Sequence, residues 1–393
     1  MTTVLLFEHQ LSEEELTPDQ ALALGASGVV DVQPAWSAGR YRLKAGAIVG
    51  SVNLRDGLIV RVLPKLEIRR VVYLLCHAEG LATWDERIID VDDDATIDQA
   101  LAEAFATAAE RTLRRGPRSS YFTQEEDLTE VRGRMDANRQ RLRYGLPLPI
   151  SVIFDEYGPD IAENRLILGA AMQLQRLPDL SATLRRRLRR LVTSLEGVRP
   201  ARRDEANIPV FFNRLNDAYV PAVALSRAVL QGVSFDLGDG PRRVTGFTVN
   251  MNRLFERFLS VALADALANR DGRICAQRSD HLDRDRHARI IPDLTWIRNE
   301  KPVVVIDAKY KDPSDGKAVD GDLYQVVAYC AGLGIRRAFL VHATIAAQAT
   351  LFIESAGIKI VVTGLDLAAP LSVLQTQLSG LANQIDQLPV PAP

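Results

Sequence analysis

Two apolar segments separated by a short polar break, residues 290–309, constrain the fold of this chain more than any other stretch. They read I-I-P-D-L-T-W-I-R-N-E-K-P-V-V-V-I-D-A-K. Because a strand alternates its side chains between two faces, Asp307 and Lys309 share one face of the second segment. A hairpin centred on Glu300 would place Asp293 directly opposite Asp307, with Cβ atoms roughly 4.5–5.5 Å apart. We therefore expect two carboxylates and an ammonium group to converge at one end of a hairpin.

Like charges that face each other across a strand pair are destabilising unless something offsets them, and a divalent cation is the natural candidate. Mg²⁺ uses one or two carboxylates together with waters and phosphate oxygens. We predict a site for Mg²⁺, with Mn²⁺ as the alternative, whose ligands are Asp293, Asp307 and the backbone carbonyl of Ala308. Lys309 would orient or deprotonate the attacking water, or stabilise charge on phosphorus, which is the chemistry of phosphodiester hydrolysis. The competing interpretation is an exposed strand edge with ordinary acids and a lysine, because P-D…D-x-K alone is a weak pattern.

Lysine is rare in this chain and is concentrated beside the paired acids. Four of the seven lysines lie between residues 301 and 317, and the other basic residues are arginines. Lysine can shift its pKa, whereas arginine stays protonated. Lys309 is fixed on the strand face that carries Asp307, so it is the lysine for which we predict a chemical role.

Two predicted helices flank the hairpin and supply further candidates. Residues 251–268 form an amphipathic pattern with Glu256 at the edge of its apolar face. Residues 322–332 form a second helix, on which Gln325 and Tyr329 are four apart and share a face. Glu256 is a candidate to support the acid pair from the first of these helices. Gln325 and Tyr329 would support the site, or else form a polar pair at a helix–sheet contact.

Length and composition bound the class of protein. The chain has 393 residues, which predicts two or three domains. A net charge of −2 gives no overall basic signature, so any nucleic-acid binding must use local patches. Three cysteines without a C-x-x-C pair favour a reducing cytoplasm. We find no signal peptide, no apolar run of the roughly 20 residues that span a bilayer, and no G-x-x-x-x-G-K-[ST] loop for nucleotide hydrolysis.

The order of predicted elements indicates a mixed α/β fold in three regions. Residues 1–160 are expected to form a smaller α+β domain, with a hairpin turning at Asp56-Gly57. Residues 161–240 form a helical connecting region, and residues 241–393 form a domain with a mixed sheet flanked by helices. An arginine- and leucine-rich helix at 181–195 and a glycine-rich, turn-like stretch at 231–246 fit no motif.

Several motifs in a fixed order carry a resemblance to a known family. I-P-D-L followed by V-V-V-I-D-A-K is similar to the restriction-endonuclease-like PD-(D/E)XK nuclease superfamily, with Glu256 matching its first-helix acid. The resemblance implies that Glu256 acts with Asp293 and Asp307 as a catalytic and metal-binding group. L-Y-Q-V-V-A-Y resembles the Q-x-x-x-Y element of the RecB-like branch. Four further motifs occur along the chain: L-P-K-L-E, L-T-E-V-R-G-R-M-D, F-D-E-Y-G-P-D-I-A-E-N-R and N-M-N-R-L-F-E-R-F. Together they resemble McrC, the nuclease subunit of McrBC-type modification-dependent restriction systems, over most of the chain.

The resemblance implies a partner and a division of labour. McrC-like proteins work with McrB, a hexameric AAA+ GTPase that reads modified DNA. It implies an N-terminal region that engages this ring and stimulates GTP hydrolysis, and a C-terminal domain that cuts double-stranded DNA. The hairpin at 47–63 and the arginines of 132–143 are the segments we would place at the ring.

Two other functions remain open from the sequence. The chain could be chiefly an adaptor that activates the GTPase while its nuclease fold clamps DNA. Strong GTPase stimulation by residues 1–160 alone, without cleavage, would show that the two roles are separable. It could also be a RecB-like exonuclease that needs no motor, which cleavage of linear DNA ends by the isolated chain would favour.

Overall fold

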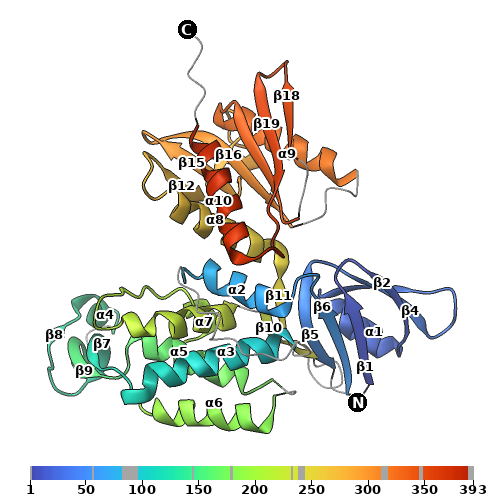
Figure 1. Ribbon diagram of the computed structural model, residues 1–393. Coiled ribbons are helices and arrows are strands. Elements are labelled where there is room, and N and C mark those ends of the chain that lie inside the picture. Colours follow the sequence, from blue (N-terminus) through green and yellow to red (C-terminus); the bar gives the residue numbers. More distant parts are fainter. Residues whose placement is uncertain are drawn as a thin grey trace. The chain divides into compact units, whose positions relative to one another are not determined.

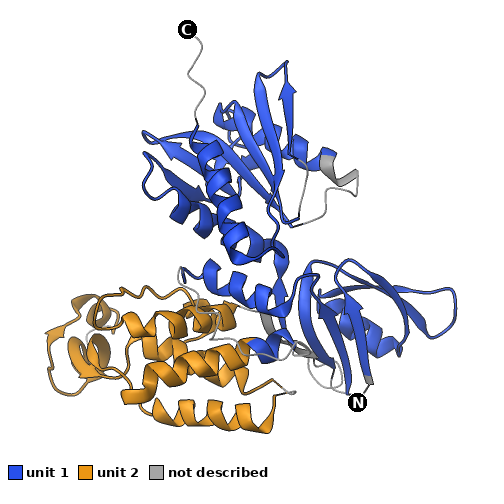
Figure 2. Ribbon diagram, in the orientation of Figure 1, with its two compact units in different colours: residues 1–85, 91–100, 233–393 blue, residues 86–90, 101–232 orange. Residues whose placement is uncertain are grey.

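The structure is a computed structural model, and it forms two compact units (Figure 2). It describes residues 2–54, 57–81, 96–143, 146–177, 180–231, 233–237, 244–310, 317–344 and 348–387. The first unit comprises residues 1–85, 91–100 and 233–393, and the second comprises residues 86–90 and 101–232. These units distribute the chain differently from the three regions expected at 1–160, 161–240 and 241–393. The partner-binding role of the first region stays a prediction.

A six-stranded mixed sheet forms the C-terminal part of the first unit, as predicted (Figure 1). Its order is β12 (Arg273–Ala276), β15 (Leu294–Arg298), β16 (Lys301–Lys309), β17 (Arg337–His342), β19 (Ile358–Gly364) and β18 (Ala349–Ile353). Strands β16, β17 and β19 are parallel, and the others are antiparallel to their neighbours. The flanking helices are α8 (Met251–Ala266), α9 (Lys317–Leu333) and α10 (Leu371–Asp386).

Strand β16 presents alternate residues to different helices. Val305 packs in a buried cluster with Val326 and Cys330 of α9. At the end of the strand, the ring of Tyr310 lies 6.4 Å from that of Phe255 on α8. The sheet is therefore covered by helices on both faces, which explains why β15 and β16 read as nearly continuous apolar runs.

The predicted hairpin register is confirmed. Leu294 pairs with Ile306 and Trp296 with Val304, a pairing centred on residue 300. After Trp296 the register shifts by one residue, so the turn narrows to Asn299-Glu300. Both turn residues have positive φ, 48° and 59°, as a two-residue hairpin turn of the favoured twist requires. The predicted register, which would place Asp293 beside Asp307, is thus present as far as the neighbouring pair, Leu294 and Ile306.

A second sheet in the first unit corrects the interpretation of residues 231–246. It has the order β1 (Thr2–Phe7), β6 (Leu58–Leu63), β5 (Ile48–Leu54), β11 (Val244–Asn250) and β10 (Val233–Leu237). Predicting a turn-like stretch was wrong for residues 233–237 and 244–246, because β10 and β11 pair with each other and β11 pairs with β5. Residues 238–243 lie outside the described residues. Gly50 permits this pairing, since a Cβ there would lie 2.2 Å from the Phe247 carbonyl oxygen. The pairing of β11 with β5, which lie almost 200 residues apart in sequence, leaves no local signature.

The rest of the first unit is smaller. A three-stranded sheet has the order β2 (Leu11–Glu15), β4 (Arg40–Ala45) and β3 (Val30–Pro34), and it lies near α1 (Pro18–Ala26). Helix α2 (Ile68–Ala78) packs on α8, and a two-stranded ribbon joins β13 (Asp280–His281) to β14 (Arg289–Ile290). The β5–β6 hairpin is confirmed, although Asp56 of its turn lies outside the described residues.

The second unit is mostly helical, with one small sheet. Its helices are most of α3 (Ile97–Thr112), α4 (Ala137–Arg141), α5 (Ala162–Leu174), α6 (Ala182–Ser194) and α7 (Val220–Gln231), with short 3-10 turns at Leu113–Arg115, Arg203–Glu205 and Asp217–Tyr219. The sheet has the order β7 (Ser120–Leu128), β9 (Ile150–Gly158) and β8 (Arg134–Met135). Two of the arginines within 132–143, Arg139 and Arg143, pair with Asp127 of β7.

Arg187 holds α6 to α3, and its removal gives a first prediction. Its guanidinium donates to Glu103 at 2.6 Å and to both carboxylate oxygens of Glu110 at 2.9 and 3.0 Å. Arg187→Ala would leave two half-buried acids without their partner, so we expect a loss of about 1–3 kcal/mol in the free energy of unfolding. Chemical denaturation measures it. Arg189→Ala, an exposed position on the same helix, is the control and should change stability by less than about 0.5 kcal/mol. An equal effect of both variants would contradict the assignment.

Candidate active site

The acid pair and the lysine meet at the C-terminal end of β16. Asp293 immediately precedes β15, and its Oδ2 accepts a hydrogen bond from the backbone N–H of Ala308 at 2.9 Å. The Lys309 ammonium lies 2.8 Å from Asp307 Oδ2. Asp307 is only 1 % exposed. The structure therefore brings together, at the end of one strand, the three residues that the hairpin register predicted to converge.

Helix α9 places three polar side chains around Lys309. Its ammonium donates to Gln325 Oε1 at 3.0 Å, and Gln325 Nε2 donates to the Tyr329 hydroxyl at 2.8 Å. Asp322 Oδ1 lies 4.0 Å from the same ammonium. Residues 322, 325 and 329 share one helix face by their three- and four-residue spacing. Gln325 thus orients the lysine and is in turn oriented by Tyr329.

Burial and mutual repulsion raise the pKa values of the acids. Burial, followed by the charge of Asp293, raises the pKa of Asp307 to about 7. Burial also raises the pKa of Asp293, against the Ala308 hydrogen bond and the Lys309 charge, which lower it. For Lys309, burial lowers the pKa, but the nearby carboxylates, Asp307 first, outweigh it and keep the ammonium protonated. The site therefore combines one ammonium group with carboxyl groups whose ionisation is opposed by burial and, for Asp307, by the charge of Asp293.

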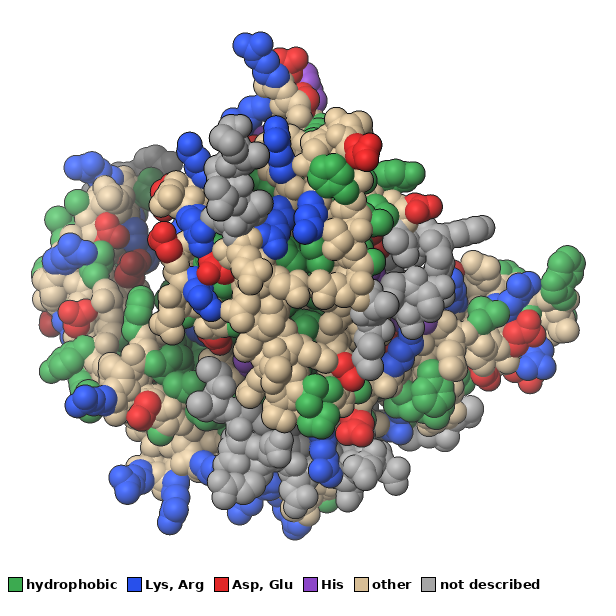
Figure 3. All heavy atoms as spheres, turned by 45° about the horizontal axis from the view of Figure 1, so that its top comes forward, with side chains coloured by type: hydrophobic (Ala, Val, Ile, Leu, Met, Phe, Trp, Pro, Cys, Tyr) green, Lys and Arg blue, Asp and Glu red, His purple; other side chains and the backbone are tan. Residues whose placement is uncertain are grey.

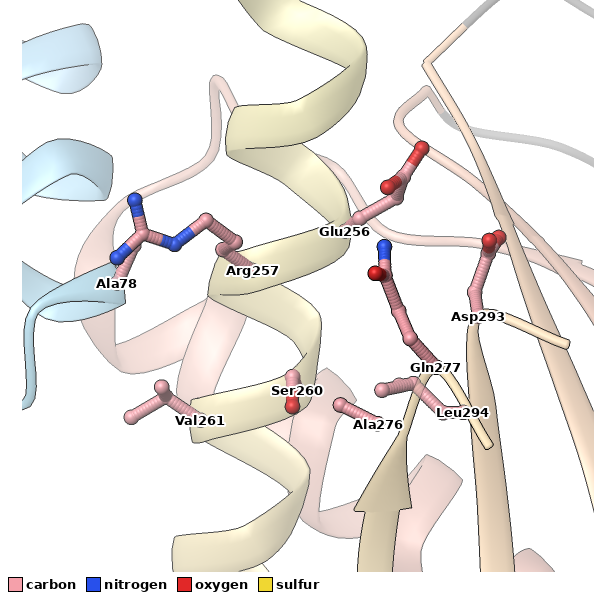
Figure 4. A pocket seen from close by; sticks show the side chains of 9 residues that line it. All are labelled: Ala78, Glu256, Arg257, Ser260, Val261, Ala276, Gln277, Asp293 and Leu294. Carbon is pink, nitrogen blue, oxygen red and sulfur yellow. The ribbon is translucent and has the colours of Figure 1, made fainter. Parts of the chain in front are cut away.

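Glu256 and Asp293 line one open pocket of about 470 Å³, between α8 and the strands that contain Ala276 and Leu294. Figure 4 shows both carboxylates and the Gln277 amide extending into this space, whereas Arg257 points to the other side of α8. Burial, then the charge of Asp293, raises the pKa of Glu256 to about 7. Glu256 thus lies within electrostatic reach of the acid pair.

The donor set fits a hard divalent cation with open coordination positions. Asp307 Oδ1 is buried and accepts no hydrogen bond from the residues described, which is costly unless a cation or another donor approaches. Across the described part of the chain, no three carboxylate, imidazole or thiolate groups are gathered closely enough to enclose a metal ion. Glu256 therefore does not complete a closed three-acid cage. Two carboxylates suffice for Mg²⁺, whose remaining ligands are waters and substrate oxygens.

Sequence reasoning missed two polar residues of this site. Asp322 could have been found from its three-residue spacing to Gln325 on the predicted helix. Gln277 follows β12 with a positive φ of 45°, and its backbone N–H donates to the Asp293 carbonyl at 2.8 Å. No local pattern predicts that strand pairing, so its sequence carried no signal.

Fold and site together define a class: an α/β protein whose mixed sheet presents one buried carboxylate, one half-buried carboxylate and a lysine at one strand end. A family model described as "McrBC 5-methylcytosine restriction system component" matches residues 43–343. The chain belongs to this family, which confirms the resemblance found in its motifs. No curated protein matches it significantly.

Two solved structures are similar to this chain. One is the "Refined half-complex from tetradecameric assembly of Thermococcus gammatolerans McrB AAA+ hexamers with bound McrC", with a TM-score of 0.60, 19 % identity, and coverage of 98 % of this chain and 100 % of that one. The other is the "Cryo-EM structure of the Thermococcus gammatolerans McrBC complex", with a TM-score of 0.41, 21 % identity, and coverage of 68 % and 89 %. The first shares the fold across nearly the whole chain. No helix among the described residues is long and apolar enough to cross a membrane.

Proposed function

We propose that this chain is the DNA endonuclease subunit of a McrBC-like restriction complex and hydrolyses phosphodiester bonds with Mg²⁺. The observation that carries the proposal is the junction of Asp293, Asp307 and Lys309 at the end of β16. The PD-(D/E)XK resemblance of the same residues and the restriction-system family support it. The site gathers carboxyl groups whose ionisation burial opposes and a bound cation would favour.

Each side chain has a defined task in this proposal. A bound Mg²⁺ would hold a phosphate oxygen and make water a stronger nucleophile at neutral pH. Asp293 and Asp307, with the Ala308 carbonyl, would hold the ion, and Glu256 would accept a proton or position water from across the pocket. Lys309 presents an ammonium to charge developing on the phosphate, and Gln325 and Tyr329 fix its direction.

We infer that an AAA+ GTPase like McrB is the partner. The McrC in the similar solved assembly is bound to McrB AAA+ hexamers, and the present chain matches that fold over 98 % of its length. No nucleotide-binding P-loop occurs in the sequence, so a motor would be a separate chain. The substrate would be double-stranded, modified DNA, and the cell compartment the cytoplasm.

Direct measurement of Mg²⁺ binding tests the cation site without the motor. Chelation in a cleavage assay is ambiguous, because a GTPase also needs Mg²⁺. Calorimetric titration of the isolated chain with Mg²⁺ or Mn²⁺ should show one site that is absent in Asp307→Asn. Near pH 7, binding should release protons, since Asp307 must ionise. Unchanged binding by the variant would refute the assigned ligand.

Gln325 gives a prediction about positioning. Gln325→Ala removes the acceptor that holds the Lys309 ammonium, and we expect cleavage of modified plasmid to slow by about 10–100-fold, as for other orienting contacts at metal sites. Mg²⁺ affinity should remain nearly unchanged, which separates positioning from metal binding. Gln375→Ala, at an exposed position on α10, is the matched control. If Gln325→Ala cleaves at the rate of this control, Gln325 has no such role.

A further inference from the structure

Helix α6 and the segment after it are strongly basic. Between residues 181 and 203 the chain has eight arginines and a single carboxylate, Glu196. This contrasts with a net charge of −2 for the whole chain. On the face of the molecule in Figure 3, basic and acidic side chains are intermixed. The basic segment therefore requires its own explanation.

Packing explains two of the five arginines on α6. The helix buries Leu184, Leu188 and Leu191. Arg187 is bound by Glu103 and Glu110 of α3. Arg185 donates to the backbone carbonyls of Gln175 and Leu177, at 3.3 and 3.2 Å. These two arginines hold the helix in place.

The other three arginines form an exposed basic face. Arg186, Arg189 and Arg190 follow the three- and four-residue spacing of one helix side and are all exposed. With Thr183 they line an open hollow of about 480 Å³. Arg186 donates to the Thr183 hydroxyl at 3.4 Å, and no described carboxylate forms an ion pair with the three guanidinium groups. Like charges at this spacing repel, so an anionic ligand would relieve a built-in cost.

We propose that the α6 basic face, defined by Arg186, Arg189 and Arg190, binds the phosphate backbone of double-stranded DNA, with residues of the second unit that are not part of the cleavage site. Guanidinium groups and hydroxyls are common phosphate ligands, and arginine binds phosphate in a bidentate manner. The lining of the hollow includes no apolar or aromatic side chain, although such residues are enriched in protein–protein interfaces. This chemistry favours a polyanion that is bound through its phosphates, independently of its base sequence. The inference rests on the proposed function for its substrate.

Duplex binding by the full chain tests the α6 basic face. We would measure fluorescence anisotropy of a labelled duplex in EDTA, so that no cleavage occurs, over a range of salt concentrations. The triple variant Arg186→Gln, Arg189→Gln and Arg190→Gln should bind at least about tenfold more weakly. The slope of log affinity against log salt concentration should become less negative by about 2–3, because each phosphate contact contributes about 0.9 to its magnitude. The corresponding Lys triple should retain most of the wild-type slope.

The control removes the same charge elsewhere in the second unit. Arg111, Arg114 and Arg115 are exposed at the end of α3 and in the turn after it, and changing all three to Gln should alter affinity less than threefold. Equal losses in both Gln triples would overturn the proposal, because net charge alone would then account for binding. A wild-type chain that binds no duplex would also overturn the proposal. So would an α6 variant that keeps its DNA affinity but no longer binds the GTPase partner. Cleavage by the Asp307→Ala protein tests the nuclease site separately from all of these outcomes.

Discussion

Lys309→Ala is expected to slow DNA cleavage by about 10²–10³-fold, the range for loss of one positioned group that stabilises developing negative charge. The ammonium lies 2.8 Å from Asp307 and is oriented by Gln325, and the variant removes it while leaving both carboxylates in place. Lys309→Arg should not restore the rate, because a planar guanidinium does not reproduce a compact ammonium. Cleavage of modified plasmid in the presence of the GTPase partner measures the effect.

Lys301→Ala is the matched control for this variant. Lys301 begins β16, at the opposite end of the strand from Lys309, and is exposed. The positive charge of Lys309 lowers the pKa of both Asp293 and Asp307. Its loss should therefore also move the pH dependence of the residual activity toward higher pH. Cleavage by Lys309→Ala within threefold of the control would contradict a chemical role for Lys309.

Asp307→Asn is expected to stabilise the metal-free protein at pH 8 while abolishing cleavage. The pKa of Asp307 is about 7 in the folded chain and about 4 in an unfolded one. A carboxyl that binds its proton more tightly when folded confers full stability below pH 4, and this stability is lost as pH rises toward 7. One pKa unit corresponds to about 1.4 kcal/mol, so an uncharged isostere should recover up to a few kcal/mol at pH 8.

Thermal unfolding at two pH values measures the effect of Asp307→Asn on stability. In EDTA, the Tm difference between Asp307→Asn and the wild type should be several degrees at pH 8 and near zero at pH 4. Asp285→Asn, in an exposed loop, should show no such pH-dependent difference. Mg²⁺ should narrow the gap at pH 8 by stabilising only the wild type. A variant less stable than the wild type at pH 8 would show that the carboxylate is not strained by burial.

Local patterns predicted what depends on neighbouring residues. The period-two alternation and the polar break predicted the β15–β16 hairpin, and the register follows from its centre at residue 300. The helical period predicted α8 and the apolar stripe of α6. The lysine at position 309 was singled out by scarcity of lysine and by its strand face. Each of these conclusions needs only a short window of sequence.

Features that depend on distant pairing were not predictable. Strand β11 joins a sheet whose members β1, β5 and β6 lie in the first 63 residues through its pairing with β5, and no short window of sequence contains both β5 and β11. For the same reason Gln277 was missed, since it reaches the site only because β12 pairs with β15. Asp322 was predictable, because it shares a helix face with Gln325, but it lies outside the Q-x-x-x-Y motif.

The central claim is that Asp293 and Asp307 form the centre that cuts DNA, in a chain that also activates its motor. The most direct measurement records plasmid cleavage and GTP hydrolysis in the same reaction, with the Asp307→Ala chain, the GTPase partner and modified DNA. We predict that this complex shows no detectable cleavage of the plasmid. Its rate of GTP hydrolysis should equal that of the wild-type complex. Full cleavage of the plasmid by the Asp307→Ala complex would contradict it.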